Sequence, residues 1–152
     1  MFSIEAIMST DLITVSPGAT LAEARTLMRE NQIHHLPVID GEDNLLGLVS
    51  LTDVLAATDS FLRGDDERIH AAEIKIDDVM VRDVATVERE ASLRSAALFL
   101  EKHRIGCLPV MYEEKICGII TDTDFVAVAI NLLEQIESTE PVMDEFDDLD
   151  VA

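Results

Sequence analysis

The stretch Met8-Ser9-Thr10-Asp11-Leu12-Ile13-Thr14-Val15 returns 72 residues later as Met80-Val81-Arg82-Asp83-Val84-Ala85-Thr86-Val87. The same offset aligns Leu36-Pro37-Val38 with Leu108-Pro109-Val110, and 11 of the 31 positions from Met8 to Val38 are identical in the two copies. A repeat of this length is one supersecondary unit that cannot bury its apolar face alone, so the two copies are expected to pack on each other. Packing with pseudo-twofold symmetry creates paired clefts between the copies, and such clefts can bind ligands.

Each copy is predicted to run strand, helix, strand, turn, strand, helix, so the fold class is α/β. In the first copy we expect strands at 13–15, 36–39 and 45–50, a helix that begins after Thr20, and a closing helix from about Leu51. Thr20 and Glu23 have the spacing of a capping box. In the second copy we expect strands at 108–112 and 116–121, a helix after Ser92, and a closing helix from about Asp122.

These elements divide the chain into a first repeat at 1–60, a connection at 61–75, a second repeat at 76–135 and an acidic tail at 136–152. The tail is expected to be disordered, because the chain has eight acidic residues and no lysine or arginine from residue 134 onward. A docking tail for a basic protein partner is the other interpretation.

The net charge of −20 argues against nucleic acid and anionic membranes as partners, because both require a basic surface. No stretch approaches the roughly 18 uninterrupted apolar residues of a membrane span, and the first residues lack the basic region of a secretory signal. We therefore expect a cytoplasmic protein.

The two cysteines, Cys107 and Cys117, lie ten residues apart across a predicted hairpin. The spacing alone allows a disulfide, but apolar-flanked cysteines of a cytosolic protein are more often reduced and buried, as we expect here.

The closing helix of the second copy is apolar on more than one face, with Phe125, Val126, Val128 and Ile130 followed by Leu132-Leu133. Such a helix must be covered. We expect the first repeat and a second subunit to cover it, and therefore a homodimer.

Two related motifs carry the chemistry, Gly47-x-x-Ser50-x-x-Asp53 and Gly118-x-x-Thr121-x-x-Asp124. The glycine permits close approach of another backbone or a flat ligand. The carboxylate suits the vicinal diol of a ribose, and the hydroxyl with the free N–H groups of a helix start suits a phosphate oxygen. The alternative is that these hydroxyls and carboxylates only cap helices. The occurrence of both motifs at equivalent points favours a nucleoside monophosphate site.

With these features the chain resembles the tandem cystathionine-β-synthase (CBS) domain family, whose paired domains are called a Bateman module. The resemblance covers roughly residues 4–134 and depends on the Met8 and Met80 segments, the two Leu-Pro-Val strands and the two glycine motifs. It implies two β-α-β-β-α repeats packed with pseudo-twofold symmetry. It also implies regulatory binding of an adenosine compound, such as AMP, ADP, ATP or S-adenosylmethionine, without catalysis and without a further cofactor.

The resemblance further implies that each ligand site combines the hydroxyl and Asp of one repeat with the segment before Pro of the other. One site would join Thr121 and Asp124 to Thr14, Ile33, His34 and His35. The second would join Ser50 and Asp53 to Thr86, Ile105, Gly106 and Cys107.

The first of these two sites is expected to bind the nucleotide more strongly, because His34 and His35 can donate hydrogen bonds to a phosphate. Against this, Asp122 adds negative charge, and Thr52 and Thr123 stand where an Arg would precede each motif Asp, which disfavours triphosphates more than AMP. Adjacent residues on a strand point to opposite faces, so His34 and His35 are not expected to chelate one metal ion. We expect no metal site.

The chain shows no catalytic motif, such as a nucleophile elbow or a P-loop. The favoured hypothesis is a free-standing regulatory module that binds an adenosine compound, with AMP first, and changes the geometry of its dimer. The alternative is an interaction module that binds no nucleotide and recruits a protein partner. A hydrolase that uses the ribose-binding carboxylates is a third and weaker hypothesis.

Overall fold

The computed structural model of the protein describes residues 3–61 and 73–139. Its helices are α1 (Ile4–Ile7), α2 (Leu21–Asn31), α3 (Leu51–Phe61), α5 (Leu93–His103) and α6 (Asp122–Thr139), with a 3-10 turn η1 (Ile76–Asp78). Its strands are β1 (His35–Ile39), β2 (Leu45–Ser50), β3 (Val87–Glu88), β4 (Cys107–Tyr112) and β5 (Lys115–Thr121). The α/β fold of two tandem repeats is confirmed. Most of the expected connection at 61–75 lies outside the described residues.

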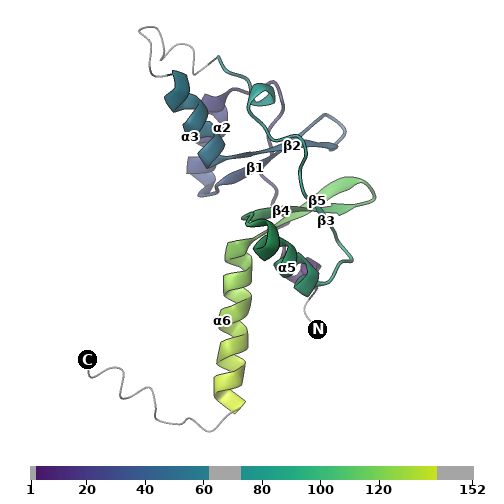
Figure 1. The fold of residues 1–152 in the computed structure, drawn as a ribbon. Helices are drawn as coiled ribbons and strands as arrows, with labels where there is room; N and C mark the ends of the chain where they lie inside the picture. The colour runs from purple at the N-terminus through teal and green to yellow at the C-terminus, as the bar shows by residue number, and fades with distance from the viewer. Residues whose placement is uncertain (1–2, 62–72, 140–152) are drawn as a thin grey trace, which may run out of the picture.

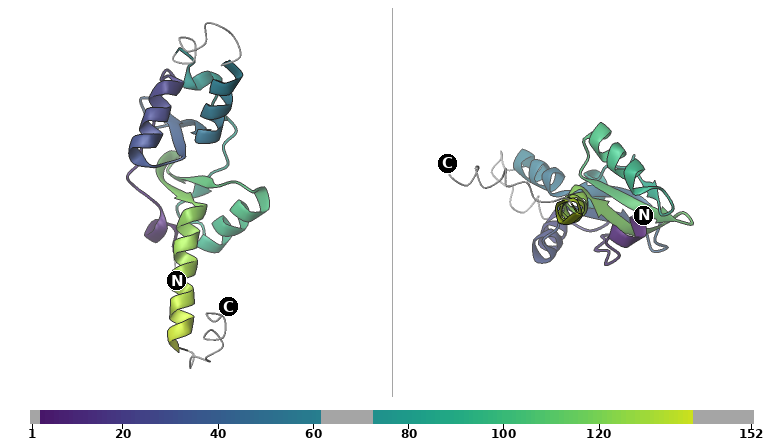
Figure 2. Two further views of the ribbon diagram at one scale, coloured as in Figure 1. Left: turned by 90° about the vertical axis from the view of Figure 1, so that its left-hand side faces the viewer. Right: turned by 90° about the horizontal axis from the view of Figure 1, so that it is seen from below.

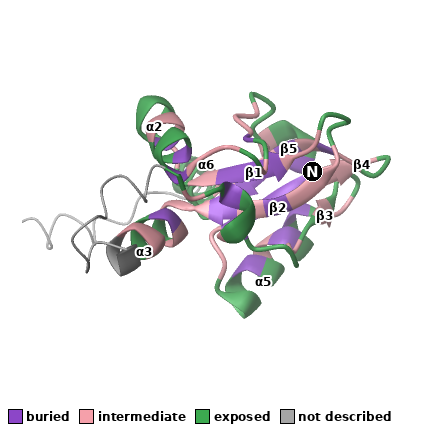
Figure 3. Ribbon diagram, turned by 90° about the horizontal axis from the view of Figure 1, so that it is seen from above, coloured by how far each residue is buried: buried purple, intermediate pink, exposed green. Residues whose placement is uncertain are grey.

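The two repeats lie one above the other, with their strands toward the centre and helices α2, α3 and α5 on the outside (Figure 1). Strands β1 and β2 form an antiparallel pair, while β3, β4 and β5 form a sheet in which β4 pairs parallel with β3 and antiparallel with β5. The register shifts at the same place in both hairpins, between Val38 and Ile39 and between Val110 and Met111. The buried residues gather on these strands and on the inward faces of the helices (Figure 3).

The strand expected at 13–15 is reduced to one bridge between Val15 and Val38, so this prediction was wrong in extent. The equivalent strand β3 is held by one further bond, which the Arg89 N–H donates to the Met111 carbonyl over 2.9 Å. Pro17 occupies the position of Arg89 in the first repeat and has no N–H to donate. The first repeat therefore lacks this bond, and Ser16, the equivalent of Glu88 in β3, does not belong to a strand.

The helix starts follow the predicted capping chemistry. The Glu23 N–H donates to Thr20 Oγ1 over 3.2 Å and the Thr20 N–H donates to Glu23 Oε2 over 3.0 Å, which completes the capping box of α2. Ser92 accepts from the Ser95 N–H over 3.0 Å at the start of α5. The closing helices begin at Leu51 and Asp122, as expected.

Each repeat contributes a leading segment to the core of the other. Ile4 is fully buried in the second core with Leu93 and Leu100, whereas its repeat equivalent Ile76 is fully buried in the first core. Met80 also belongs to the first core. The two repeats are therefore interlocked through their leading segments, beyond the packing of one copy on the other.

The two motif glycines lie where these exchanged segments cross the last strand of each repeat. A Cβ on Gly47 would lie 2.7 Å from Met80 Sδ and 2.8 Å from the Val81 carbonyl oxygen, and a Cβ on Gly118 would lie 2.6 Å from Met8 Sδ. Neither position has room for a side chain. The glycines therefore serve the close approach of another backbone and a methionine side chain, one of the two alternatives that their pattern allows.

Helix α6 extends away from both repeats (Figures 1 and 2). Phe125 and Val128 pack against the second core, but no residue of the helix is buried. The expectation that the first repeat covers this helix is therefore wrong. The helix also continues to Thr139, so residues 136–139 are not part of a disordered tail, because Ile136 extends the helical spacing of Leu132 and Leu133. The rest of the expected tail lies outside the described residues.

Both cysteines are free, as expected, although only Cys107 is buried and Cys117 is half-buried. The strand register explains the absence of a bond between them, because Cys107 pairs with Thr121 and not with Cys117. Within the described ranges, no helix combines the length and the apolar character that a membrane span requires.

Candidate functional site

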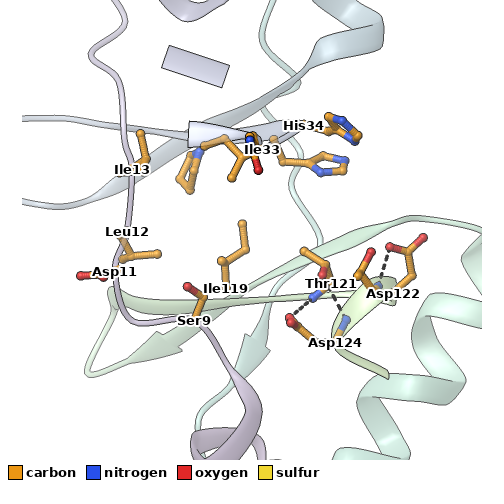
Figure 4. A pocket seen from close by; sticks show the side chains of 14 residues that line it. Ser9, Asp11, Leu12, Ile13, Ile33, His34, Ile119, Thr121, Asp122 and Asp124 are labelled. Atoms are coloured by element: carbon orange, nitrogen blue, oxygen red, sulfur yellow. Dashed lines mark hydrogen bonds between the residues drawn. The ribbon is translucent and has the colours of Figure 1, made fainter. Parts of the chain in front are cut away.

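A cleft of about 350 Å³ opens between the two repeats, which we call the first cleft. The loop before β1 borders one side of it and the junction of β5 with α6 borders the other, while the leading segment of the chain closes one end (Figure 4). Its volume is within the range of ordinary small-molecule sites. The first cleft is lined by Ser9, Asp11, Leu12, Ile13, Gln32, Ile33, His34, His35, Pro37, Ile119, Thr121, Asp122, Thr123 and Asp124.

Backbone hydrogen bonds hold both sides of the first cleft. The Leu51 N–H donates to the His34 carbonyl over 2.8 Å, which ties the loop before β1 to the start of α3. The N–H groups of Ser9 and Ile119 each donate to the carbonyl of the other residue, over 2.9 and 3.0 Å. The leading segment is thereby fixed along β5, and the lining residues are positioned before any ligand binds.

A second cleft of about 260 Å³ lies at the pseudo-symmetric position. It is lined by His35, Leu48, Ser50, Asp53, Val81, Asp83, Val84, Ala85, Ile105, Gly106 and Cys107. The structure therefore brings together the residues expected at each site from opposite repeats: Ile33, His34 and His35 with Thr121 and Asp124 in the first cleft, and Ile105, Gly106 and Cys107 with Ser50 and Asp53 in the second.

Thr14 and Thr86 are the two expected site residues that line neither cleft. Their neighbours Ile13 and Ala85 line the first and second cleft instead. Adjacent residues of an extended segment point to opposite sides, so when Ile13 faces the cleft Thr14 faces away. Thr14 borders a shallow surface hollow beside α2.

The hydroxyl and the carboxylate of each motif form a reciprocal cap. In the second repeat, the Thr121 N–H donates to Asp124 Oδ2 over 2.8 Å and the Asp124 N–H donates to Thr121 Oγ1 over 3.4 Å. Ser50 and Asp53 repeat the arrangement over 3.1 and 3.0 Å. Each motif hydroxyl and carboxylate therefore caps a helix, as the alternative interpretation of the motifs predicts. Among the described residues, Oδ1 of Asp124 takes no hydrogen bond, which leaves one oxygen for a ligand in the cleft.

The first cleft is acidic. Asp11, Asp122 and Asp124 line it, and no lysine or arginine does so among the described residues. Burial lowers the pKa of His35, although Asp122 and Asp53 oppose this effect and His34 adds to it. The imidazole of His35 is therefore mostly neutral at pH 7, and an anionic ligand would favour its protonation.

His34 precedes β1, which begins at His35, so the expectation that these two side chains point to opposite faces of one strand was wrong. Both line the first cleft. In the part of the chain that the structure describes, no group of three His, Cys, Asp or Glu side chains is arranged to hold a metal ion.

Several lining residues were not expected from the sequence. Asp11 and Asp83 occupy equivalent positions in the two clefts, as do Ile119 and Leu48. The identity of Asp11 and Asp83 in the duplicated stretch was a signal for the first pair. Leu48 and Ile119 lie directly after the motif glycines, and their apolar side chains carried no signal that distinguishes them from core residues of a strand.

The chain belongs to the CBS domain family. The family profile matches residues 4–60 and 76–131, which are the two interlocked repeats described above.

A CBS domain-containing protein from Dictyostelium discoideum is 30% identical over 88% of this chain and 94% of its own length. A solved Vibrio cholerae protein, whose name assigns it to acetoin utilization, is 41% identical and covers 93% of this chain and 99% of its own, with a TM-score of 0.78. The solved complex of CBSX2 with AMP is 28% identical over 87% of this chain and 98% of its own, with a TM-score of 0.73. The chain also matches archaeal homoserine O-acetyltransferases and inosine-5'-monophosphate dehydrogenases, of which it spans only 21–24%.

Proposed function

We propose that the chain is a regulatory module that binds an adenosine compound, with AMP preferred, in the first cleft. The observation that carries the proposal is the meeting of Ile33, His34 and His35 from one repeat with Thr121 and Asp124 from the other. These side chains supply an apolar wall, two imidazoles, a hydroxyl and a carboxylate around one cavity. This set matches the base, phosphate and ribose of a nucleoside monophosphate.

In the proposed complex each part of the nucleotide has a chemical partner. The purine packs between the apolar side chains of Ile33 and Ile119. The ribose hydroxyls donate to Oδ1 of Asp124, because a carboxylate only accepts hydrogen bonds. The phosphate lies near His34 and His35, whose ring N–H groups donate to it, and its charge favours the protonated form of His35. The AMP bound to CBSX2, a relative at 28% identity, supports the same ligand class here.

The charge of the first cleft favours a monophosphate over a triphosphate. Asp11, Asp122 and Asp124 repel every added phosphate group, and the cleft offers two imidazoles and no lysine or arginine among its described residues. The two imidazoles can donate hydrogen bonds to a single phosphate, whereas each further phosphate of ADP and ATP adds negative charge beside the three carboxylates. We therefore expect the order of affinity AMP, ADP, ATP.

The proposed role is regulatory and not catalytic. Prolonged incubation should leave AMP and ATP intact, whereas turnover that Asp124→Ala abolishes would favour the hydrolase hypothesis.

Thermal unfolding with AMP, ADP, ATP and S-adenosylmethionine tests the proposal. A ligand at about 100 times its dissociation constant adds about 2.7 kcal/mol to the free energy of unfolding, and AMP is expected to raise the midpoint most. If none of the four ligands moves the midpoint, the chain is better described as an interaction module that recruits a protein partner.

We further propose that a second copy of the chain covers α6, which gives the homodimer through which a bound ligand would act. Val126, Ile130 and Leu133 lie on one side of the helix and are 51–57% exposed. Phe125 and Val128, near the start of the same helix, pack on the second core, and further apolar side chains follow along the helix. A second α6 would supply a matching apolar face.

Leu133→Glu is expected to convert the dimer into a monomer, because it introduces a charge into the apolar contact of both copies. Sedimentation equilibrium measures the change in mass. Gln135→Glu, the matched control, introduces the same charge on the opposite side of α6 and should leave the mass unchanged. A wild-type chain that sediments as a monomer would contradict the proposed dimer.

A further inference from the structure

Among the described residues, His35 is the one side chain that lines both clefts. It lies beside Gly106 of the second repeat: a Cβ on Gly106 would make ordinary van der Waals contacts, 3.6 Å from His35 Cε1 and 3.5 Å from Asp122 Oδ2. The imidazole of the first repeat thus lies close to Gly106 of the second repeat and lines both clefts.

The second repeat offers no equivalent group. Cys107 occupies the repeat position of His35, and Gly106 occupies that of His34. Cys107 is buried, and its burial, with Asp122 and Asp124 nearby, raises the pKa of its thiol to about 12. The thiol is therefore neutral at pH 7. Of the described residues in the second cleft, His35 alone can carry a positive charge near neutral pH.

His35 is electrostatically coupled to both clefts. Burial lowers the pKa of its imidazole, and His34 lowers it further, while Asp122 on the side of the first cleft and Asp53 on the side of the second raise it. The other charged side chains that line the clefts are acidic: Asp11 and Asp124 in the first, and Asp83 in the second. A phosphate in either cleft would add the negative charge that stabilises the imidazolium.

On the basis of the proposed nucleotide site, we infer that His35 is a binding residue shared by the two clefts, and that a phosphate-bearing ligand in the first cleft weakens the binding of a second such ligand in the second cleft. His35 carries at most one positive charge, so it cannot neutralise a phosphate in each cleft at once. The first cleft retains His34 as a further donor, so the first phosphate binds there. A second phosphate then enters a cleft that holds Asp53 and Asp83 and has no cation left to balance them.

Protonation of His35 should make the affinity for AMP depend on pH. The pKa of His35 lies below its ordinary value in the empty protein and rises when a phosphate binds, so the protein takes up a proton between these two pKa values. The affinity of the tighter site for AMP therefore falls as the pH rises through this window. Adenosine, which has no phosphate, should show a flatter profile.

Isothermal titration of the whole chain with AMP and with adenosine tests the inference. For AMP we expect one tight site and a second site at least about tenfold weaker, the scale of one lost interaction with a charged group. For adenosine the two sites should differ less. Cys107→His gives the second cleft an imidazole of its own and should bring the two AMP affinities within about threefold of each other. His35→Gln should weaken the tight AMP site and flatten its pH profile, with thermal unfolding as the check that both variants are folded.

Different calorimetric results would contradict the shared role of His35 and the proposed nucleotide binding. Two equal AMP sites in the wild-type chain, or a pH profile that His35→Gln leaves unchanged, would overturn the shared role of His35 while the nucleotide module stands. No heat with either ligand, together with no shift in thermal unfolding, would overturn both. The comparison of AMP with adenosine on the wild-type chain requires no variant, so the inference stays testable if Cys107→His does not fold.

Discussion

Ile4→Ala is expected to lower the free energy of unfolding by about 2–5 kcal/mol, the usual cost of truncating a fully buried isoleucine. Residues near a chain end are ordinarily poorly packed, and replacing one of their side chains usually costs little stability. Ile4 lies in the four-residue helix α1 but is 0% exposed. Urea denaturation measures the change. Leu98→Ala is the matched control, because Leu98 is 51% exposed on α5, and it should change stability by less than about 0.5 kcal/mol.

The location of the damage tests the exchange of leading segments. Ile4 belongs to the same buried cluster as Leu93 and Leu100 of α5, so Ile4→Ala should reduce the hydrogen-exchange protection of α5 more than that of α2. Ile76→Ala, at the equivalent position in the first core, should do the reverse. If Ile4→Ala costs no more than Leu98→Ala, or loosens α2 first, the repeats are not interlocked in this way.

Asp124→Ala is expected to raise the dissociation constant for AMP by about tenfold to a hundredfold, which corresponds to the roughly 1.5–3 kcal/mol of a hydrogen bond to a charged group. The ribose hydroxyls lose their acceptor, whereas adenine alone should lose little affinity. Titration calorimetry with both ligands measures the difference.

Asp53→Ala is the matched control, because Asp53 caps α3 in the second cleft as Asp124 caps α6 in the first. Both variants lose a helix cap and should lose similar stability, about 0.5–2 kcal/mol. Only Asp124→Ala should weaken the tighter AMP site strongly. Equal weakening of AMP and adenine by Asp124→Ala would mean that this carboxylate serves the fold and not the ribose.

The elements of the fold that depend on local sequence were predicted most accurately. The starts of the closing helices at Leu51 and Asp122 and the capping box at Thr20 depend on local chemistry, and each is present as expected. The strand at 13–15 was overestimated, because residues 13 and 14, like the equivalent residues 85 and 86 of the second repeat, are extended but lie outside the strand pairing, which local sequence does not reveal. Local signals are reliable where the neighbouring residues alone decide the structure.

The composition of the two clefts was predicted better than the direction of individual side chains. The partners Ile33 and Asp124 follow from the paired motifs of opposite repeats, and they line one cleft. Thr14 does not line the first cleft, because the side of an extended segment that faces a cleft depends on tertiary packing. His34 and His35 line the same cleft, and only His35 belongs to strand β1, so the alternation of side chains along a strand does not apply to this pair.

The exchange of leading segments and the exposure of α6 could not be read from the sequence. Both depend on contacts between residues far apart in the chain, such as Met8 with Gly118. The apolar pattern of α6 showed that the helix needs cover but not which surface provides it.

The most direct test of the nucleotide site is a titration of the isotopically labelled protein with AMP, followed through its backbone amide NMR signals. We expect the first and largest shifts at Ile33, His34, Thr121 and Asp124, which come from opposite repeats and meet only in the first cleft. Shifts at Ser50 and Asp53 should follow at higher AMP concentration. An unchanged spectrum, or shifts confined to residues outside both clefts, would contradict the assignment of this module as an adenosine-compound sensor.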